Sequence, residues 1–172
     1  PSIQGDEQPI EVETLVFCNG ISQVAPMTGQ SQARPEISGV FFQFEKDRLK
    51  IAGTDSFRLA EKTLAFQNPS SSSHSFILPS KTARELIFVL GERPGKTKIY
   101  VSPNQVVFDY APEDQPSRLH IQLVSRLIEG EYPNYMRLFP CTSQGMAEMR
   151  VPVAALRDAI KNILPFTHPH TG

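Results

Sequence analysis

Side chains that could take part in catalysis or binding are most concentrated in GTDSFRLAEKTL, residues 53–64. From Thr54 to Arg58 it places a hydroxyl, a carboxylate, a second hydroxyl, a large aromatic ring and a guanidinium in consecutive positions. Gly, Asp and Ser favour a turn here, and the alternation of apolar and charged residues that follows favours a strand. Three interpretations fit: the lip of an enzyme site, a surface where another protein docks, or a turn in which Asp55 bonds its own backbone.

A hydrolase would need a nucleophile, a base and an orienting carboxylate. The candidates are Ser56, Asp55, His74 and His120. The sequence has no G-x-S-x-G nucleophile elbow. His168 and His170 are candidate metal ligands, but an isolated His-Pro-His segment supplies too few ligands for a site. Glu129 and Glu131 are paired carboxylates in sequence only, and a charged turn explains them. We therefore expect no catalytic residue, no metal and no cofactor.

Composition narrows the class of protein further. The chain has 172 residues and a net charge of −1. This charge excludes a strongly basic protein that binds nucleic acid through its overall charge, but it permits a local basic face. Its two cysteines, Cys18 and Cys141, lie far apart in the sequence and do not form the pattern of a disulfide-stabilised protein. Such sparse use of cysteine is typical of proteins in a reducing compartment. No apolar run approaches the length of about 18 residues that a membrane span needs. We expect a cytoplasmic protein without a membrane partner.

The same pattern, a short apolar strand followed by a helix, occurs at residues 9–29, 75–92 and 148–164. In the second copy the helical stripe consists of Ala83, Leu86, Ile87 and Leu90. Gly20 weakens the prediction of a helix in the first copy. The first two copies lead into predicted strands, whereas the third stops after its helix. The pattern predicts an α+β fold built from a duplicated β-α-β-β-β unit, with two helices on antiparallel sheets, cut from a longer repetitive protein.

Three segments resemble the bacterial sliding clamp family, the β subunit of the replicative DNA polymerase III. They are RPEISGVFFQFEKDRLKIAGTDSFRLA (34–60), FILPSKTARELIFVLG (76–91) and SRLIEGEYPNYMRLFP (125–140). The combination of T-D-x-x-R-L-A with S-R-L-I-E-G-x-(Y/F)-P-x-Y is specific to this family. The resemblance implies the DNA-clamp fold, with residues 11–133 as the middle domain, made of half-repeats at about 11–67 and 75–133. Residues 1–10 would be a lead-in from the first domain, and 134–172 the truncated start of the third.

In that family the full-length protein forms a homodimeric ring around duplex DNA and has no catalytic activity. It docks polymerase subunits, the clamp loader and repair proteins through short linear motifs. The resemblance thus implies a fragment of a processivity factor, and we expect this fragment to be monomeric. The alternatives are a stand-alone peptide-binding module that never encircles DNA and, more remotely, the Ser/His/Asp hydrolase.

The resemblance also implies a partner-peptide pocket, formed by Ile37, Thr54, Ser56, Phe57, Arg58, Leu59, Pro133, Arg137 and Leu138. Pro133 and the aliphatic side chains would form an apolar slot, while Thr54 and the backbone around Ser56 would offer hydrogen bonds. Many family members have Gly-His where this chain has Ser56-Phe57, so its peptide preference should differ. The C-terminal tail that forms the far wall in the family is missing, so the pocket should be half-built and weak.

The family's helices face DNA, and the implied DNA-facing residues are Arg34, Lys81, Arg84, Arg157 and Lys161. The first helix has no Lys or Arg, only polar residues such as Asn19, Ser22 and Gln23. We therefore expect binding to duplex DNA that is weak, independent of sequence and steeply dependent on salt.

Overall fold

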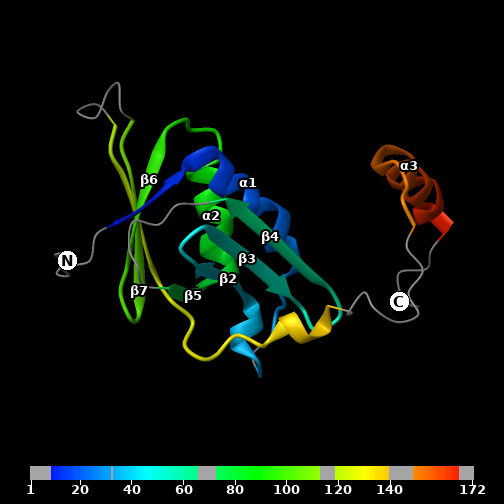
Figure 1. Ribbon diagram of the computed structural model, residues 1–172, viewed down its shortest axis with the longest axis horizontal. Coiled ribbons are helices and arrows are strands. Elements are labelled where there is room, and N and C mark those ends of the chain that lie inside the picture. The colour runs from blue at the N-terminus through cyan, green and yellow to red at the C-terminus, as the bar shows by residue number, and fades with distance from the viewer. Residues whose placement is uncertain (1–8, 32, 66–72, 113–118, 140–148, 167–172) are drawn as a thin grey trace. The chain divides into compact units, whose positions relative to one another are not determined.

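The computed structural model describes residues 9–31, 33–65, 73–112, 119–139 and 149–166 (Figure 1). The described residues exclude most of the expected lead-in and residues 66–72, which lie between the two half-repeats. They also exclude Cys141, His168 and His170. Contacts divide the chain into two compact units, Pro1–Pro133 and Asn134–Gly172.

The first unit contains the order strand, helix, strand, strand, strand twice. The first copy consists of β1 (Ile10–Glu13), α1 (Thr14–Val24), β2 (Gly39–Phe44), β3 (Arg48–Thr54) and β4 (Leu59–Ala65). The second consists of β5 (His74–Pro79), α2 (Ser80–Leu90), β6 (Lys96–Val101), β7 (Gln105–Tyr110) and β8 (Ile121–Arg126). Short 3-10 turns, η1 (Ala25–Met27) and η2 (Pro35–Ser38), join α1 to β2. The predicted α+β fold with a duplicated unit is confirmed.

The two copies exchange their first strands. One antiparallel sheet has the order β1-β6-β7-β8 and the other β4-β3-β2-β5. β1 therefore pairs with the second copy, where Ile10 lies opposite Ile99, and β5 pairs with the first, where Ile77 lies opposite Phe41. Each sheet is completed by a strand from the other half of the sequence.

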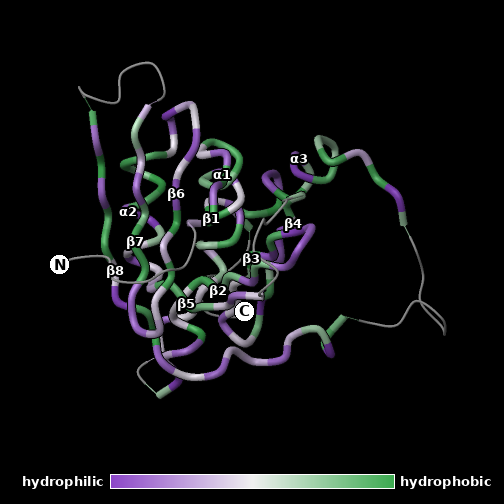
Figure 2. Tube along the Cα trace, turned by 60° about the vertical axis from the view of Figure 1, so that its left-hand side comes forward, coloured by the Kyte–Doolittle hydropathy of each residue, from purple (hydrophilic) through white to green (hydrophobic). Residues whose placement is uncertain are grey.

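One hydrophobic core joins both sheets and both helices. Phe17, Ile21 and Val24 of α1 are buried. The ring of Phe17 lies between two others, with centroids 5.7 Å from Phe42 in β2 and 6.2 Å from Phe108 in β7. α1 and α2 pack against each other and against the β2–β5 sheet (Figure 1). Figure 2 shows hydrophobic and hydrophilic residues alternating along the helices and strands. Because of this alternation, each element has one apolar face that packs into the core.

α1 runs through Gly20 without a break, although glycine weakens helices. A β-carbon at this position would lie 3.0 Å from Cδ1 of Ile51 and 3.2 Å from Cδ1 of Leu64. Gly20 thus lets the helix approach strands β3 and β4 closely, and this tertiary packing outweighs the local propensity.

The second unit contains the 3-10 turns η3 (Tyr135–Leu138) and η4 (Leu164–Phe166) and the helix α3 (Val153–Ile163). The predicted third helix is therefore present. Its apolar stripe, Val153, Leu156, Ile160 and Ile163, is 46–80% exposed. Among the described residues, no helix has the length and apolar character that a membrane crossing requires.

Candidate peptide-docking loop

The loop 55–58 connects β3 to β4, and Thr54 lies opposite Leu59 where the two strands pair. The side chain of Thr54 holds this loop from inside, because its hydroxyl donates to the carbonyl of Arg58 at 2.7 Å and accepts the N–H of Ser56 at 3.1 Å. Thr54 is 7% exposed. Its hydroxyl is therefore used within the loop, contrary to the expectation that it offers hydrogen bonds to a peptide.

Asp55 fixes the loop from outside. One carboxylate oxygen accepts the N–H groups of Phe57 (3.0 Å) and Arg58 (2.7 Å), and the other accepts Nε and Nη2 of Arg58 at 2.9 and 2.8 Å. The backbone and side chain of Arg58, followed by the backbone N–H of Phe57, lower the pKa of Asp55 from 3.8 to about 2. The expectation that Asp55 bonds its own turn is confirmed.

Ser56 has a φ of +76° and is the one non-glycine residue with positive φ among the described residues. This left-handed conformation is easy for glycine and costly for other residues. Nη1 of Arg34 donates to the Ser56 hydroxyl at 3.2 Å, and Nε of Arg34 bonds Glu36 at 3.0 Å. Arg34, expected to face DNA, thus lies against this loop.

The loop presents Phe57 and Arg58 outward. The Phe57 side chain is 96% exposed and Arg58 is exposed, while Leu59 is half-buried behind them. Ile37 is buried, with 4% exposure, and lies beneath: the N–H of Gly29 is shared between the carbonyls of Ile37 (2.9 Å) and Thr54 (3.1 Å). An aromatic ring and an arginine stem are therefore held on a rigid base, an arrangement that suits contact with a peptide.

The remaining expected pocket residues lie further along the chain. Pro133 is half-buried and ends the first unit. Arg137 and Leu138 belong to η3 of the second unit, where both are exposed and Leu138 is 70% exposed.

Most of the expected DNA-facing cations lie on helices. Lys81 and Arg84 are exposed on α2. Arg157 and Lys161 are exposed on α3, where Nε of Arg157 lies 3.7 Å from the carboxylate of its neighbour Asp158. α1 exposes the uncharged side chains of Asn19, Ser22 and Gln23, and those of Ser22 and Gln23 donate back to Asn19.

The residues considered for a hydrolase lie in different places. Nε2 of His120, just before β8, is 2.8 Å from the carboxylate of Asp109 in β7. Ser56 lies in a loop of the other sheet, and His74 pairs with Phe44 at the end of that sheet away from the loop. The described residues contain no group of three or more acidic, His or Cys side chains placed to hold a metal ion.

Residues 127–132, whose course the sequence did not indicate, run from β8 across the β2–β5 sheet. We term them the crossing segment. The N–H of Leu127 donates to the carbonyl of Asn104 (3.0 Å), and that of Ile128 donates to the carbonyl of Ile77 (2.9 Å). Its last residue, Tyr132, stacks on Phe41 with ring centroids 4.7 Å apart, and burial raises the pKa of this tyrosine to about 12. The crossing segment thus anchors the chain immediately before Pro133. Its apolar residues show no regular period, so periodicity could not identify it.

Comparisons with known proteins support the resemblance. Residues 11–134 match the family model described as DNA polymerase III beta subunit, central domain. The beta sliding clamp of Staphylococcus aureus is 30% identical over 140 residues, which are 81% of this chain and 34% of that protein. The chain therefore spans about a third of the length of this relative.

Solved structures show the same architecture. The DNA polymerase sliding clamp of Bacillus subtilis is 25% identical, with a TM-score of 0.86 over 100% of this chain and 42% of that one. The beta subunit from the DNA polymerase of Streptococcus pyogenes is 26% identical, with a TM-score of 0.75 over 96% of this chain and 42% of that one. The duplicated fold, the T-D-x-x-R-L-A loop and these matches lead to one conclusion: the chain belongs to the DNA polymerase III beta subunit family, the bacterial sliding clamps.

Proposed function

We propose that this chain is part of a sliding clamp that encircles duplex DNA in the cytoplasm and tethers polymerase subunits, the clamp loader and repair proteins. Its family membership supports this role. The chain covers 34% of the length of its Staphylococcus aureus relative, so a homodimeric ring would be a property of the longer protein. In this proposal residues 134–172 begin a third domain, and the chain has no catalytic activity of its own.

The observation that carries the proposal is the pre-ordered loop 55–58. Its outward Phe57 and Arg58 are held by the hydrogen bonds of Asp55 and Thr54, so a bound peptide need not order the loop. We propose that this loop, with the half-buried Leu59 and the buried Ile37, forms one wall of a peptide pocket. Pro133, the last residue of the same unit, would extend this wall.

The expected affinity is modest. A peptide burying ~400 Å² of apolar surface gains roughly 10 kcal/mol at ~25 cal/mol per Å². Association and ordering of the peptide remove about 4 kcal/mol or more. The remainder corresponds to a Kd of roughly tens of micromolar, which suits partners that must exchange.

The test is a titration of the full chain with a fluorescent peptide that begins with glutamine and ends in Leu-Phe. Arg58→Ala and Leu59→Ala should each weaken binding about tenfold, because each removes apolar contact at the slot. Arg126→Ala, at an exposed position on β8, is the matched control and should bind like the unchanged protein. Equal affinities for all four proteins would remove the pocket assignment.

We further propose that α2 and α3 face DNA through Lys81, Arg84, Arg157 and Lys161. Arg34 would both contact DNA and stabilise the loop 55–58, because its side chain already donates a hydrogen bond to Ser56. A closed ring retains DNA by topology, so a few phosphate contacts that ignore sequence suffice.

A further inference from the structure

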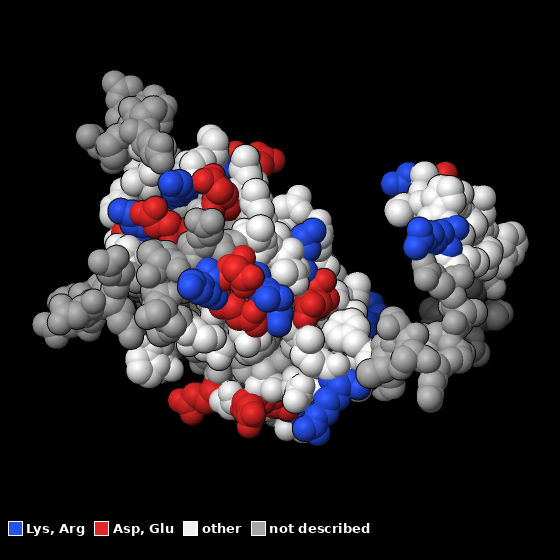
Figure 3. Space-filling model, in the orientation of Figure 1, with Lys and Arg blue, Asp and Glu red and all other residues white. Residues whose placement is uncertain are grey.

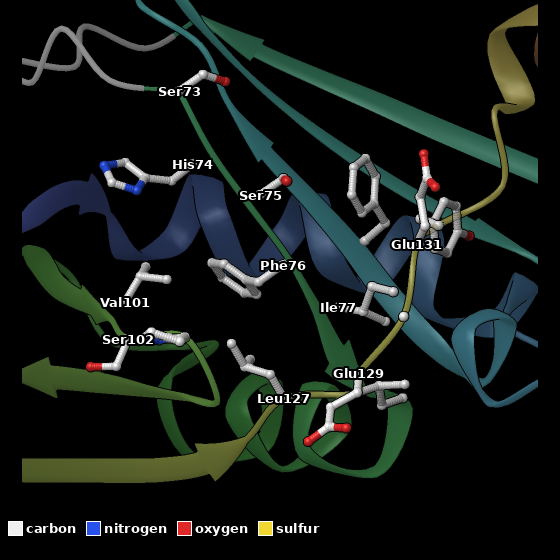
Figure 4. Close-up of a pocket in the computed structure, with 15 residues that line it drawn as sticks. Ser73, His74, Ser75, Phe76, Ile77, Val101, Ser102, Leu127, Glu129 and Glu131 are labelled. Carbon is white, nitrogen blue, oxygen red and sulfur yellow. The ribbon is translucent and has the colours of Figure 1, made fainter.

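A pocket of about 870 Å³ opens on the first unit, away from the loop 55–58. Its walls come from β5, from the turn between β6 and β7, and from the crossing segment (Figure 4). Phe76, Val101 and Leu127 supply apolar surface, while Glu129 and Glu131 belong to the crossing segment. The pocket thus combines an apolar floor with an acidic side.

One wall of this pocket is a strand edge that the crossing segment covers at Ile77 and leaves open at Ser75. β5 is the outermost strand of its sheet. The carbonyl of Ile77 bonds the N–H of Ile128, so the backbone of Ile77 points away from β2. Because alternate residues of an antiparallel strand point the same way, the N–H and carbonyl of Ser75 also point away from β2. Among the described residues no backbone group outside the sheet pairs with Ser75. An edge of this kind is a template for an added strand.

The negative charges beside this edge favour an added strand with basic side chains. Glu129 and Glu131 are exposed, and neither forms an ion pair with a described residue. Glu36 lies beside the same segment, since its Cβ is 4.0 Å from the place a β-carbon would take on Gly130, but its carboxylate already pairs with Arg34. Figure 3 shows acidic side chains at the lower margin, where Figure 1 draws the segment after β8, with basic side chains next to them on the same margin. Such a rim repels phosphate and acidic peptides and attracts Lys and Arg.

We propose that this pocket is a second docking groove, which binds an extended partner peptide with basic residues on either side of an aliphatic one. The peptide backbone pairs with Ser75, extending the β2–β5 sheet. Its aliphatic side chain lies on Phe76, Val101 and Leu127, and its basic side chains pair with Glu129 and Glu131. Main-chain pairing supplies affinity, and the carboxylates select the charge of the partner.

The first arm of the test uses the full chain and a fluorescein-labelled heptapeptide, Thr-Lys-Val-Lys-Val-Lys-Thr, followed by fluorescence anisotropy. We expect saturable binding at one site, and at least about tenfold weaker binding of the same peptide with Glu in place of Lys. No saturable binding of the lysine peptide, or equal binding of both peptides, would overturn the proposal.

The second arm separates the groove from general charge attraction. Glu129→Lys/Glu131→Lys should weaken the lysine peptide about tenfold. Glu85→Lys/Glu92→Lys makes the same charge change at exposed positions on and just after α2 and should leave the affinity within about twofold. Equal weakening by both pairs would show that net charge alone attracts the peptide, against the proposal.

The third arm tests strand addition. Ser75→Pro removes an N–H that points away from β2, so the ladder within the sheet survives while pairing with a new strand is lost. About tenfold weaker binding is expected, with the thermal midpoint and circular dichroism spectrum of the variant checked for folding. A folded Ser75→Pro protein that binds as tightly as the unchanged chain would overturn strand addition.

Discussion

Ser56 and Asp55 shape the candidate docking loop in different ways. Asp55 stabilises the loop through four acceptor contacts to backbone and guanidinium N–H groups. Ser56 opposes it, since its φ of +76° is disfavoured by a β-carbon. A glycine at this position would adopt the same backbone conformation without that cost. The loop is thus held in a strained shape by its neighbours, and this strain is open to measurement.

Ser56→Gly should raise the free energy of unfolding by about 0.5 to 1 kcal/mol, because glycine adopts positive φ without steric cost. The gain is smaller than the full relief of strain, since the variant also loses the Arg34 hydrogen bond and glycine gives the unfolded chain more freedom. Urea denaturation is the measurement. Ser102→Gly, at a position without positive φ, is the control and should lower stability. A loss of stability in Ser56→Gly would contradict the prediction.

Asp55 should make the protein sensitive to acid. Its pKa is lowered in the folded state from 3.8 to about 2, so the stabilisation it provides is present above about pH 4 and lost as the pH falls toward 2. Asp55→Asn should remove this contribution, so its difference in stability from the unchanged protein should shrink across that window. Carbon-13 NMR of the carboxyl group gives the pKa directly. A midpoint at or above 3.8 would contradict the hydrogen bonding described.

At the scale of elements, a buried contact links the two copies of the unit. Thr14, at the start of α1, and Thr97, in β6, are both 0% exposed, and their hydroxyl oxygens lie 2.9 Å apart. The pair joins the first copy of the unit to the second, far away in sequence. Because each hydroxyl satisfies the other in a buried place, the two side chains should be energetically coupled.

Thr14→Val and Thr97→Val should each cost about 1 to 3 kcal/mol, because each leaves the other hydroxyl without its partner. The double variant should cost much less than the sum, since both polar groups are then gone. A double-mutant cycle from urea denaturation measures this coupling, with exposed Thr63→Val on β4 as the control. Additive costs would show that the hydrogen bond contributes nothing.

Elements were predictable from sequence where the information is local. The stripe containing Phe17 and Ile21 has the period of a helix, and α1 follows it even through Gly20, whose role depends on Ile51 and Leu64 across the core. The strand exchange was not predictable, because alternation of side chains does not specify a distant partner strand. Within the site, the turn role of Asp55 was visible in the sequence. The internal use of the Thr54 hydroxyl and the position of Arg34 depend on contacts that no local pattern encodes.

At the scale of the whole molecule, the two faces of the β2–β5 sheet in the first unit are covered by different elements. Val40, Phe42 and Phe44 of β2 are buried in the core shared with the helices, whereas Phe41 alternates with them and stacks on Tyr132. The crossing segment therefore covers the face of this sheet that points away from α1 and α2. We propose that DNA lies on the helix side, so partner proteins can dock without competing with it for surface.

Binding to duplex DNA should depend on α2. In the double variant Lys81→Ala/Arg84→Ala, the slope of log K for DNA binding against the logarithm of the salt concentration should become shallower by about 2. The reason is that each phosphate contact contributes about 0.9 to this slope. Fluorescence anisotropy with a labelled duplex over a range of salt concentrations measures it. Lys96→Ala/Lys98→Ala removes the same charge from exposed positions on β6. The proposal fails if the two pairs change the slope equally.

The exchange of β1 and β5 has a consequence for how such a molecule can be divided. A chain cut between Ala65 and His74 yields two pieces, and each piece carries the strand that the other's sheet needs. Neither piece alone can complete a four-stranded sheet, so the halves should behave as obligate complements that regain structure only when mixed. The two copies of the unit should therefore share one unfolding transition instead of melting as separate modules.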